Sequence, residues 1–274
     1  MAEVNPYGYN PNAAAAMIFV VLFAIATLWH AIIVFRLRVW YFTVLVLGGC
    51  LEIAGYICRF LAHDNASNLI LFVIQTLTIL VAPALFAASI YMVLGRLIIL
   101  LRAEAHSPIR PAWLTKIFVG GDVLSFLIQV IGSSNLSKNF SLAKTIILLG
   151  LAIQIMFFGV FVIVAVVVDR RLSRTPTHTA QRLDAENTKL GWRGVLRVIY
   201  IASAMIFVRS IFRLIEFCGD SNSPMMKTEA YLYVCDSTLM FGVLAILIYY
   251  HPGNYIPSRK AFDQILQSRD EELL

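Results

Sequence analysis

The stretch Ala13–Phe35, AAAAMIFVVLFAIATLWHAIIVF, runs for 23 residues without an Asp, Glu, Lys or Arg. A helix rises about 1.5 Å per residue and the hydrocarbon core of a bilayer is about 30 Å thick, so roughly 20 apolar residues suffice to cross it. This stretch is therefore predicted to be a transmembrane helix. Because no basic n-region precedes it in Met1–Asn12, we do not expect it to be a cleaved signal peptide.

The same pattern recurs six more times along the chain. Apolar residues make up 59% of the 274 residues and charged residues only 14%, whereas soluble domains contain roughly 45–50% and about 25%. The predicted spans cover residues 13–35, 40–61, 69–95, 114–132, 142–168, 195–217 and 230–250. The sequence therefore predicts an all-α polytopic membrane protein, with a seven-helix domain over residues 1–253 and a tail over 254–274. The third apolar run contains Pro83, for which we expect a kink or a tilt.

Lysine and arginine are divided unequally between the two ends of these helices. Sixteen fall on one side and three on the other. Basic residues are retained on the cytoplasmic face, so the amino terminus is predicted outside and the tail in the cytoplasm. The net charge of +6 is thus an orientation signal, and no nucleic-acid partner is predicted. Six of the basic residues lie in Asp169–Gly194, where attraction to anionic membrane lipid is worth about 1 kcal/mol each.

Polar side chains recur inside four of the predicted spans at intervals of three and four residues, which places each set on one helix face. They are Glu52, Tyr56 and Arg59; Asp122, Ser125 and Gln129; Arg209, Arg213 and Glu216; and Glu229, Tyr233 and Asp236. A charge at the bilayer centre costs roughly 2.5 kcal/mol or more, so each is a candidate functional residue. Most fall in the outer half of a span. We therefore expect a polar cavity that opens toward the outside and narrows toward the cytoplasm.

The intramembrane charges do not balance. Two carboxylates are in excess, or one if Glu229 lies at the headgroups. One interpretation is that the side chains pair with one another, Arg213 with Asp236 for example, and hold the bundle together. The other is a pocket for a cationic or zwitterionic amphiphile, with a carboxylate that accepts an amine or a proton. The carboxylates are Glu52, Asp122, Glu216, Glu229 and Asp236, and the guanidiniums are Arg59, Arg209 and Arg213.

Several modification sites fall on the predicted outer side. Three sequons begin at Asn65, Asn135 and Asn139, which agrees with the orientation and makes them candidate glycosylation sites. Cys58 and Cys218 lie near the outer ends of their spans, where a disulfide is one reading and packed free thiols are the favoured one.

Other chemistries find no support in the sequence. The histidines are spread over both sides, so no metal site is predicted, and no cofactor is expected, because a Walker A pattern and a lysine in the seventh span are both missing. An enzyme would need a nucleophile beside a base, and Ser125 near Asp122 is the only such pair. We therefore predict that the protein is not an enzyme.

Seven elements in register resemble the fungal RTA1-like family of lipid-translocating exporters. The resemblance runs from about Tyr7 to Gly253. One departure lies at Tyr9-Asn-Pro11-Asn12, which only alanines follow, so a polar contact is expected to be missing there. The elements are Glu52-x-x-Gly55-Tyr56-x-x-Arg59; Ala82-Pro83 with Ala87, Ala88, Tyr91 and Arg96; Asp122-x-x-Ser125-x-x-x-Gln129-x-x-Gly132; Gly150-x-x-x-Gln154; Arg209-x-x-x-Arg213-x-x-Glu216; Glu229-x-x-x-Tyr233-x-x-Asp236; and His251-Pro252-Gly253.

The resemblance implies export or transbilayer movement of sphingoid long-chain bases at the plasma membrane or another endomembrane. In this hypothesis acids such as Asp236, Glu216 and Glu52 accept the amine or a coupling proton, and the arginines hold those acids ionised or bind a phosphate or hydroxyl. A receptor for extracellular lipid or stress is the alternative, and transport of porphyrin, haem or sterol-like compounds is a second. The expected partners are membrane lipids and an amphiphilic substrate; the sequence predicts no oligomeric state. The candidate substrate-binding residues are Glu52, Tyr56, Arg59, Asp122, Gln129, Gln154, Arg209, Arg213, Glu216, Tyr233 and Asp236.

Overall fold

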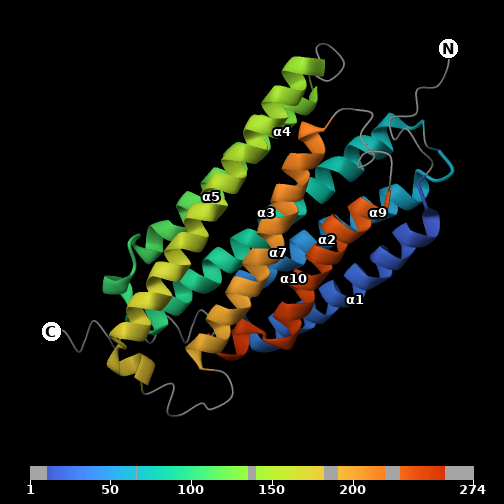
Figure 1. Ribbon diagram of the computed structural model, residues 1–274. Coiled ribbons are helices and arrows are strands. Elements are labelled where there is room, and N and C mark those ends of the chain that lie inside the picture. Colours follow the sequence, from blue (N-terminus) through green and yellow to red (C-terminus); the bar gives the residue numbers. More distant parts are fainter. Residues whose placement is uncertain (1–10, 66, 135–139, 182–190, 220–228, 257–274) are drawn as a thin grey trace.

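The protein folds as a bundle of helices in the computed structural model shown in Figure 1, which describes residues 11–65, 67–134, 140–181, 191–219 and 229–256. Within these ranges seven helical segments are long and apolar enough to cross a membrane, and none of the described residues forms a strand. The predicted all-α class with seven transmembrane helices is confirmed.

The seven segments follow the predicted spans but begin and end at their own residues. The seventh span changes from α-helix to a π-helical turn and back to α-helix. Short 3-10 turns adjoin three of the spans: η1 (Trp40–Phe42), η2 (Glu104–His106) and η4 (Pro252–Asn254). The long helices are α1 (Ala13–Leu37), α2 (Thr43–Leu61), α3 (Leu69–Leu100), α4 (Pro111–Ser134), α5 (Phe140–Arg174) and α7 (Trp192–Cys218), and the seventh span joins α9 (Glu229–Leu232), η3 (Tyr233–Ser237) and α10 (Thr238–Tyr249).

Two helices are much longer than a bilayer requires. α3 has 32 residues and α5 has 35, so α5 extends about 50 Å at the usual rise. The basic end of α5, including Arg171 and Arg174, remains helical and projects beyond the predicted span 142–168. The apolar run of the sequence predicts only the part of the helix in the membrane core. Helical hydrogen bonding continues beyond it, so α5 is longer than its apolar run.

The helices form a closed ring in chain order. α1 packs on α2, α2 on α3, α3 on α4, α4 on α5 and α5 on α7, while α10 contacts both α7 and α1 (Figure 1). α3 and α7 also contact each other across the ring. Because an odd number of spans alternates in direction, the described ends of the chain, Pro11 and Ile256, lie at opposite ends of the bundle.

The α4–α5 pair approaches closely because small residues lie between the helices. A Cβ atom added at Gly150 would come within 2.9 Å of the Ser125 backbone oxygen, and one added at Gly132 within 3.0 Å of the Ile147 backbone nitrogen. Transmembrane helices associate largely through such close packing, because lipid provides no hydrophobic force between them. In contrast, large side chains such as Ile25 and Leu28 are more than 60% exposed and face the lipid.

Candidate functional site

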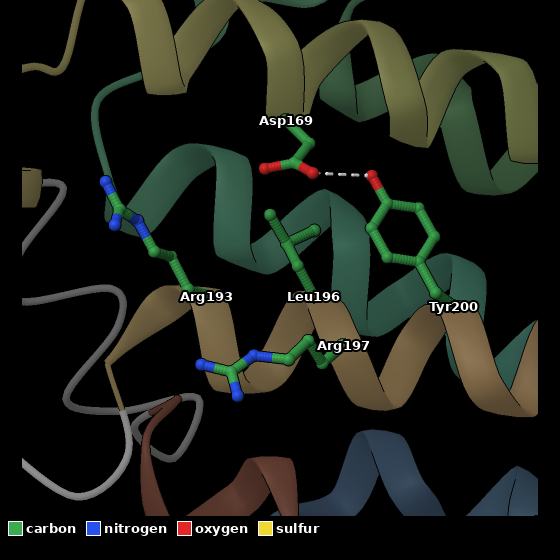
Figure 2. A pocket seen from close by; sticks show the side chains of 5 residues that line it. All are labelled: Asp169, Arg193, Leu196, Arg197 and Tyr200. Carbon is green, nitrogen blue, oxygen red and sulfur yellow. Dashed lines mark hydrogen bonds between the residues drawn. The ribbon is translucent and has the colours of Figure 1, made fainter.

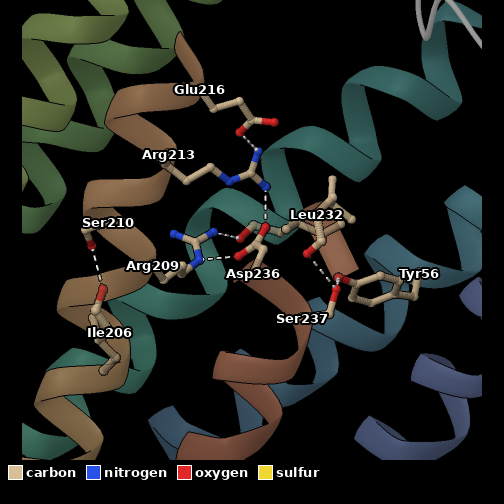
Figure 3. A network of polar contacts seen from close by, with 10 residues as sticks. Tyr56, Ile206, Arg209, Ser210, Arg213, Glu216, Leu232, Asp236 and Ser237 are labelled. Atoms are coloured by element: carbon tan, nitrogen blue, oxygen red, sulfur yellow. Dashed lines mark hydrogen bonds and ion pairs between the residues drawn. The ribbon is translucent and has the colours of Figure 1, made fainter. Parts of the chain in front are cut away.

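The centre of the candidate site is Asp236, which lies in the π turn of the seventh span and is 1% exposed. One carboxylate oxygen accepts a hydrogen bond from Arg209 Nε, and the other accepts one from Arg213 Nη2 (Figure 3). Arg213 Nη1 also donates to Glu216 Oε2 at 3.0 Å. The pairing of Arg213 with Asp236 considered from the sequence is therefore present, and the two guanidiniums are balanced by two carboxylates.

Arg209 has a further partner that connects it to α3. Its Nη2 donates to the backbone oxygen of Ile79 at 2.9 Å. Residue 83, four positions later, is a proline and has no N–H to offer that oxygen, so the carbonyl is free for another donor. Pro83 therefore frees a buried acceptor inside α3, and the guanidinium of α7 satisfies it.

Arg59 forms a second ion pair nearer the end of α2. Its Nη2 lies 2.6 Å from Glu229 Oε1, and its Nε donates to the Tyr233 hydroxyl at 3.0 Å. The backbone N–H of Asn12 donates to both oxygens of Glu229, at 3.1 and 3.0 Å. The polar contact expected to be missing at the start of the first span is thus provided by Asn12, which also caps α1 by accepting from the Ala15 N–H.

The π turn itself connects to α2 through hydroxyl groups. Ser237 Oγ donates to the Leu232 oxygen at 3.3 Å, so the single proton of the Tyr56 hydroxyl is directed to Ser237 (Figure 3). Thr238 Oγ1 donates to the Tyr233 oxygen at 2.9 Å. Both side chains satisfy carbonyls five residues earlier, where a π turn disturbs the normal ladder, and such turns are frequent at functional sites.

Glu52 differs from Asp236, Glu216 and Glu229 in that its carboxylate forms no ion pair or hydrogen bond among the described residues. It is 1% exposed, and neither of its carboxylate oxygens has a hydrogen-bond partner among the described residues. It lies one helical turn before Tyr56 and within electrostatic range of Asp236 and the two arginines. Each of the three guanidiniums has a carboxylate partner, so the excess of two acids counted in the sequence falls on Glu52 and Asp122.

Asp122 belongs to a second polar group, between α3, α4 and α5. The Tyr91 hydroxyl donates to Asp122 Oδ2 at 3.0 Å, and Gln129 Nε2 donates to Gln154 Oε1 at 3.2 Å. Ser125 Oγ donates to the backbone oxygen of Asp122 and not to its carboxylate, so the proposed nucleophile–base pair is not formed. The residues expected to line one cavity therefore form two separate hydrogen-bonded groups. The reason is that the polar faces of α4 and α2 turn toward different neighbours.

Two histidines meet at the opposite end of the bundle, which the sequence interpretation did not anticipate. The rings of His30 and His251 are 5.6 Å apart between centroids, and both are buried. His30 Nε2 lies 3.1 Å from the Leu244 oxygen, and His251 Nδ1 accepts from the Gly253 N–H. Among the described residues, no group of three or more His, Cys, Asp or Glu side chains could hold a metal ion.

The structure describes only some of the candidate disulfide and glycosylation residues on the predicted outer side. Cys58 and Cys218 are both free thiols in the structure, and Cys58 is half-buried whereas Cys218 is exposed. The end of α7 that carries Cys218 is held against α5, where Lys144 Nζ lies 3.2 Å from the Cys218 oxygen. Asn65 is exposed, as a glycosylated asparagine must be, whereas Asn135 and Asn139 lie outside the described residues.

Several contributing groups were not among the predicted binding residues. Glu229 pairs with Arg59, Ser237 binds Tyr56, and Tyr91 binds Asp122. Glu229 carried a usable signal, since it lies four residues before Tyr233 and was counted with the intramembrane acids. The Ile79 carbonyl carried one too, because a proline inside a span always leaves a carbonyl without its helical donor.

Comparison with known proteins shows the family of the chain. The sequence profile described as RTA1 like protein matches residues 45–259, which is most of the chain and includes every ion pair described above. The chain belongs to the RTA1-like family. No solved structure matches it.

Some of the similar proteins carry names related to transport. Protein RTA1 of Saccharomyces cerevisiae is 33% identical over 90% of this chain and 84% of its own length, and protoporphyrin uptake protein 1 of that yeast is 31% identical over 91% of each. The probable lipid transporter atnI of Emericella nidulans is 30% identical over 92% of this chain and 68% of its own. A more distant relative, sphingoid long-chain base transporter RSB1 of Saccharomyces cerevisiae, is 21% identical over 90% and 73%.

Proposed function

We propose that this protein moves amphiphilic lipids with a cationic head, of the sphingoid long-chain base type, across the plasma membrane. Support comes from the seven-helix fold, from membership of the RTA1-like family, and from relatives named as a lipid transporter and a sphingoid long-chain base transporter. The predicted orientation, with the amino terminus outside, puts the Asp236 cluster in the outer half of the membrane.

The observation that carries this proposal is the unpartnered carboxylate of Glu52. An ionised carboxylate without hydrogen bonds is very costly to bury, so Glu52 must take up a proton or a cationic partner. A long-chain base offers both an ammonium group for the carboxylate and an alkyl chain for the apolar walls. Asp236 is less suited to this role, because both of its oxygens are already occupied by guanidiniums.

Transport of an anionic porphyrin is the competing function suggested by one relative's name. Binding of porphyrin carboxylates would require free guanidiniums. Arg59, Arg209 and Arg213 each have a carboxylate partner, whereas the group without a partner is an acid. The balance of the site therefore favours a cationic substrate.

The direct test is movement of a fluorescent sphingoid base across liposomes that contain the purified protein. We expect Glu52→Gln to reduce the initial rate about tenfold or more, because the amide keeps the shape of the side chain but cannot become an anion. Asp64→Asn is the matched control, since it makes the same chemical change at an exposed residue outside the spans and should leave the rate unchanged.

Two results would contradict the proposal. Normal transport by Glu52→Gln would show that the Glu52 carboxylate is not required for transport. Binding of the base by the wild-type protein without any movement across the bilayer would instead favour the receptor hypothesis.

A further inference from the structure

A hollow with charged and apolar lining residues lies between α5 and α7, more than two helical turns before Arg209 along α7. It has a volume of about 210 Å³ and is lined by Asp169 of α5 and by Arg193, Leu196, Arg197 and Tyr200 of α7 (Figure 2). In the predicted orientation this end of the bundle faces the cytoplasm. No residue of the Asp236 cluster lines it, so it is a separate site.

The hollow combines two cations with one anion. Arg193 and Arg197 are four residues apart on one face of α7, both are exposed, and neither has a carboxylate partner among the described residues. Asp169 accepts a hydrogen bond from the Tyr200 hydroxyl at 3.0 Å (Figure 2). It also lies 3.4 Å from Ser173 Oγ. The carboxylate is thus held in place by two hydroxyl groups.

The surroundings favour a lipid as the occupant. Leu196 forms an apolar floor that is 2% exposed. Ile201 and Val208 continue the face of Arg197 along α7 at helical spacing, and they are 43% and 53% exposed. A headgroup in the hollow would therefore place its acyl chains along an exposed apolar stripe.

We propose that this hollow binds the headgroup of an anionic aminophospholipid of the phosphoserine type from the inner leaflet. Such a headgroup carries a phosphate, a carboxylate and an ammonium, with a net charge of −1. The two guanidiniums match the two anionic groups and Asp169 matches the ammonium, so the site and the headgroup neutralise each other. Anionic lipids of this class are abundant in the cytoplasmic leaflet.

Native mass spectrometry of the purified full-length protein, with phosphatidylserine, phosphatidic acid or phosphatidylcholine added, measures this binding. The double variant Arg193→Ala/Arg197→Ala should weaken phosphatidylserine binding about tenfold or more, which corresponds to the loss of at least one charge-assisted hydrogen bond. Arg36→Ala/Arg110→Ala is the matched control, because it removes the same charge from exposed positions that do not line the hollow. It should change the affinity by less than about threefold.

The role of Asp169 separates this headgroup from a simple phosphate. Wild-type protein should bind phosphatidylserine more tightly than phosphatidic acid, and Asp169→Asn should remove that preference. An equal loss of binding in both arginine pairs would overturn the proposal in favour of diffuse surface charge. Full displacement of phosphatidylserine by inorganic phosphate would also overturn it, because the site would then bind a free anion and not a lipid. Thermal unfolding of each variant verifies that the fold is retained.

Discussion

Asp236 accepts hydrogen bonds from two guanidiniums at once, with each carboxylate oxygen taken by a different arginine. Both arginines belong to α7, while Asp236 belongs to the seventh span, so the carboxylate joins two helices at a depth where water is scarce. Removal of one partner of a buried ion pair is strongly destabilising, since the remaining charge is left without compensation. In this case Arg209 would lose its carboxylate partner, whereas Arg213 would keep Glu216.

We therefore expect Asp236→Asn to lower the free energy of unfolding by about 3–5 kcal/mol. Glu216→Gln should cost about 1 kcal/mol or less, because Glu216 is more exposed and Arg213 retains Asp236. Thermal unfolding of the two purified variants and the wild type in the same detergent ranks their stabilities. Equal stability of Asp236→Asn and wild type would show that the cluster does not hold the helices together.

At the scale of the helical elements, α4 and α5 show how closely two spans can approach when glycine lies between them. Gly150 of α5 faces the backbone of α4. Gly120 of α4 is exposed, and nothing lies within 4 Å of a Cβ atom added there. The two glycines have the same residue type and the same α-helical conformation. They therefore separate the effect of packing from that of helix propensity.

Gly150→Ala should destabilise the protein by about 1–3 kcal/mol, because the new methyl group would meet a backbone oxygen that cannot move aside easily. Gly120→Ala should be neutral or stabilise by up to about 1 kcal/mol, since alanine is the better helix former and has open space. The measurement is again thermal unfolding in detergent. A stability loss of equal size in both variants would show that close packing is not the cause.

At the scale of the whole molecule, the sequence alone was sufficient to predict the class, the number of spans and the family. Those properties depend on long apolar runs and on the spacing of residues within each span, and both can be read from short segments of sequence. The division of the polar residues into two groups was not predictable, because it depends on which helices are neighbours. Asp122 and Glu52 show similar depth and spacing. However, α4 turns its polar face to α3 and α5, while α2 turns its own to the π turn of the seventh span.

The orientation of the whole bundle is a prediction from its basic residues, and it can be tested with single cysteines. In a variant without the four native cysteines, Asp64→Cys should react with a membrane-impermeant maleimide in intact cells. Arg110→Cys, at the opposite end of the bundle, should react only after the membrane is permeabilised. Labelling of Arg110→Cys alone in intact cells would reverse the orientation.

The hydrogen bond between Arg209 and the Ile79 carbonyl has a mechanical consequence. Because Pro83 cannot restore a helical bond to that carbonyl, separation of α7 from α3 would leave a bare acceptor in hydrocarbon, at a cost of several kcal/mol. The two helices should therefore travel together as one rigid body whenever the protein changes shape. Any passage for a lipid headgroup would then open along another seam of the ring, with the α3–α7 pair as its fixed wall.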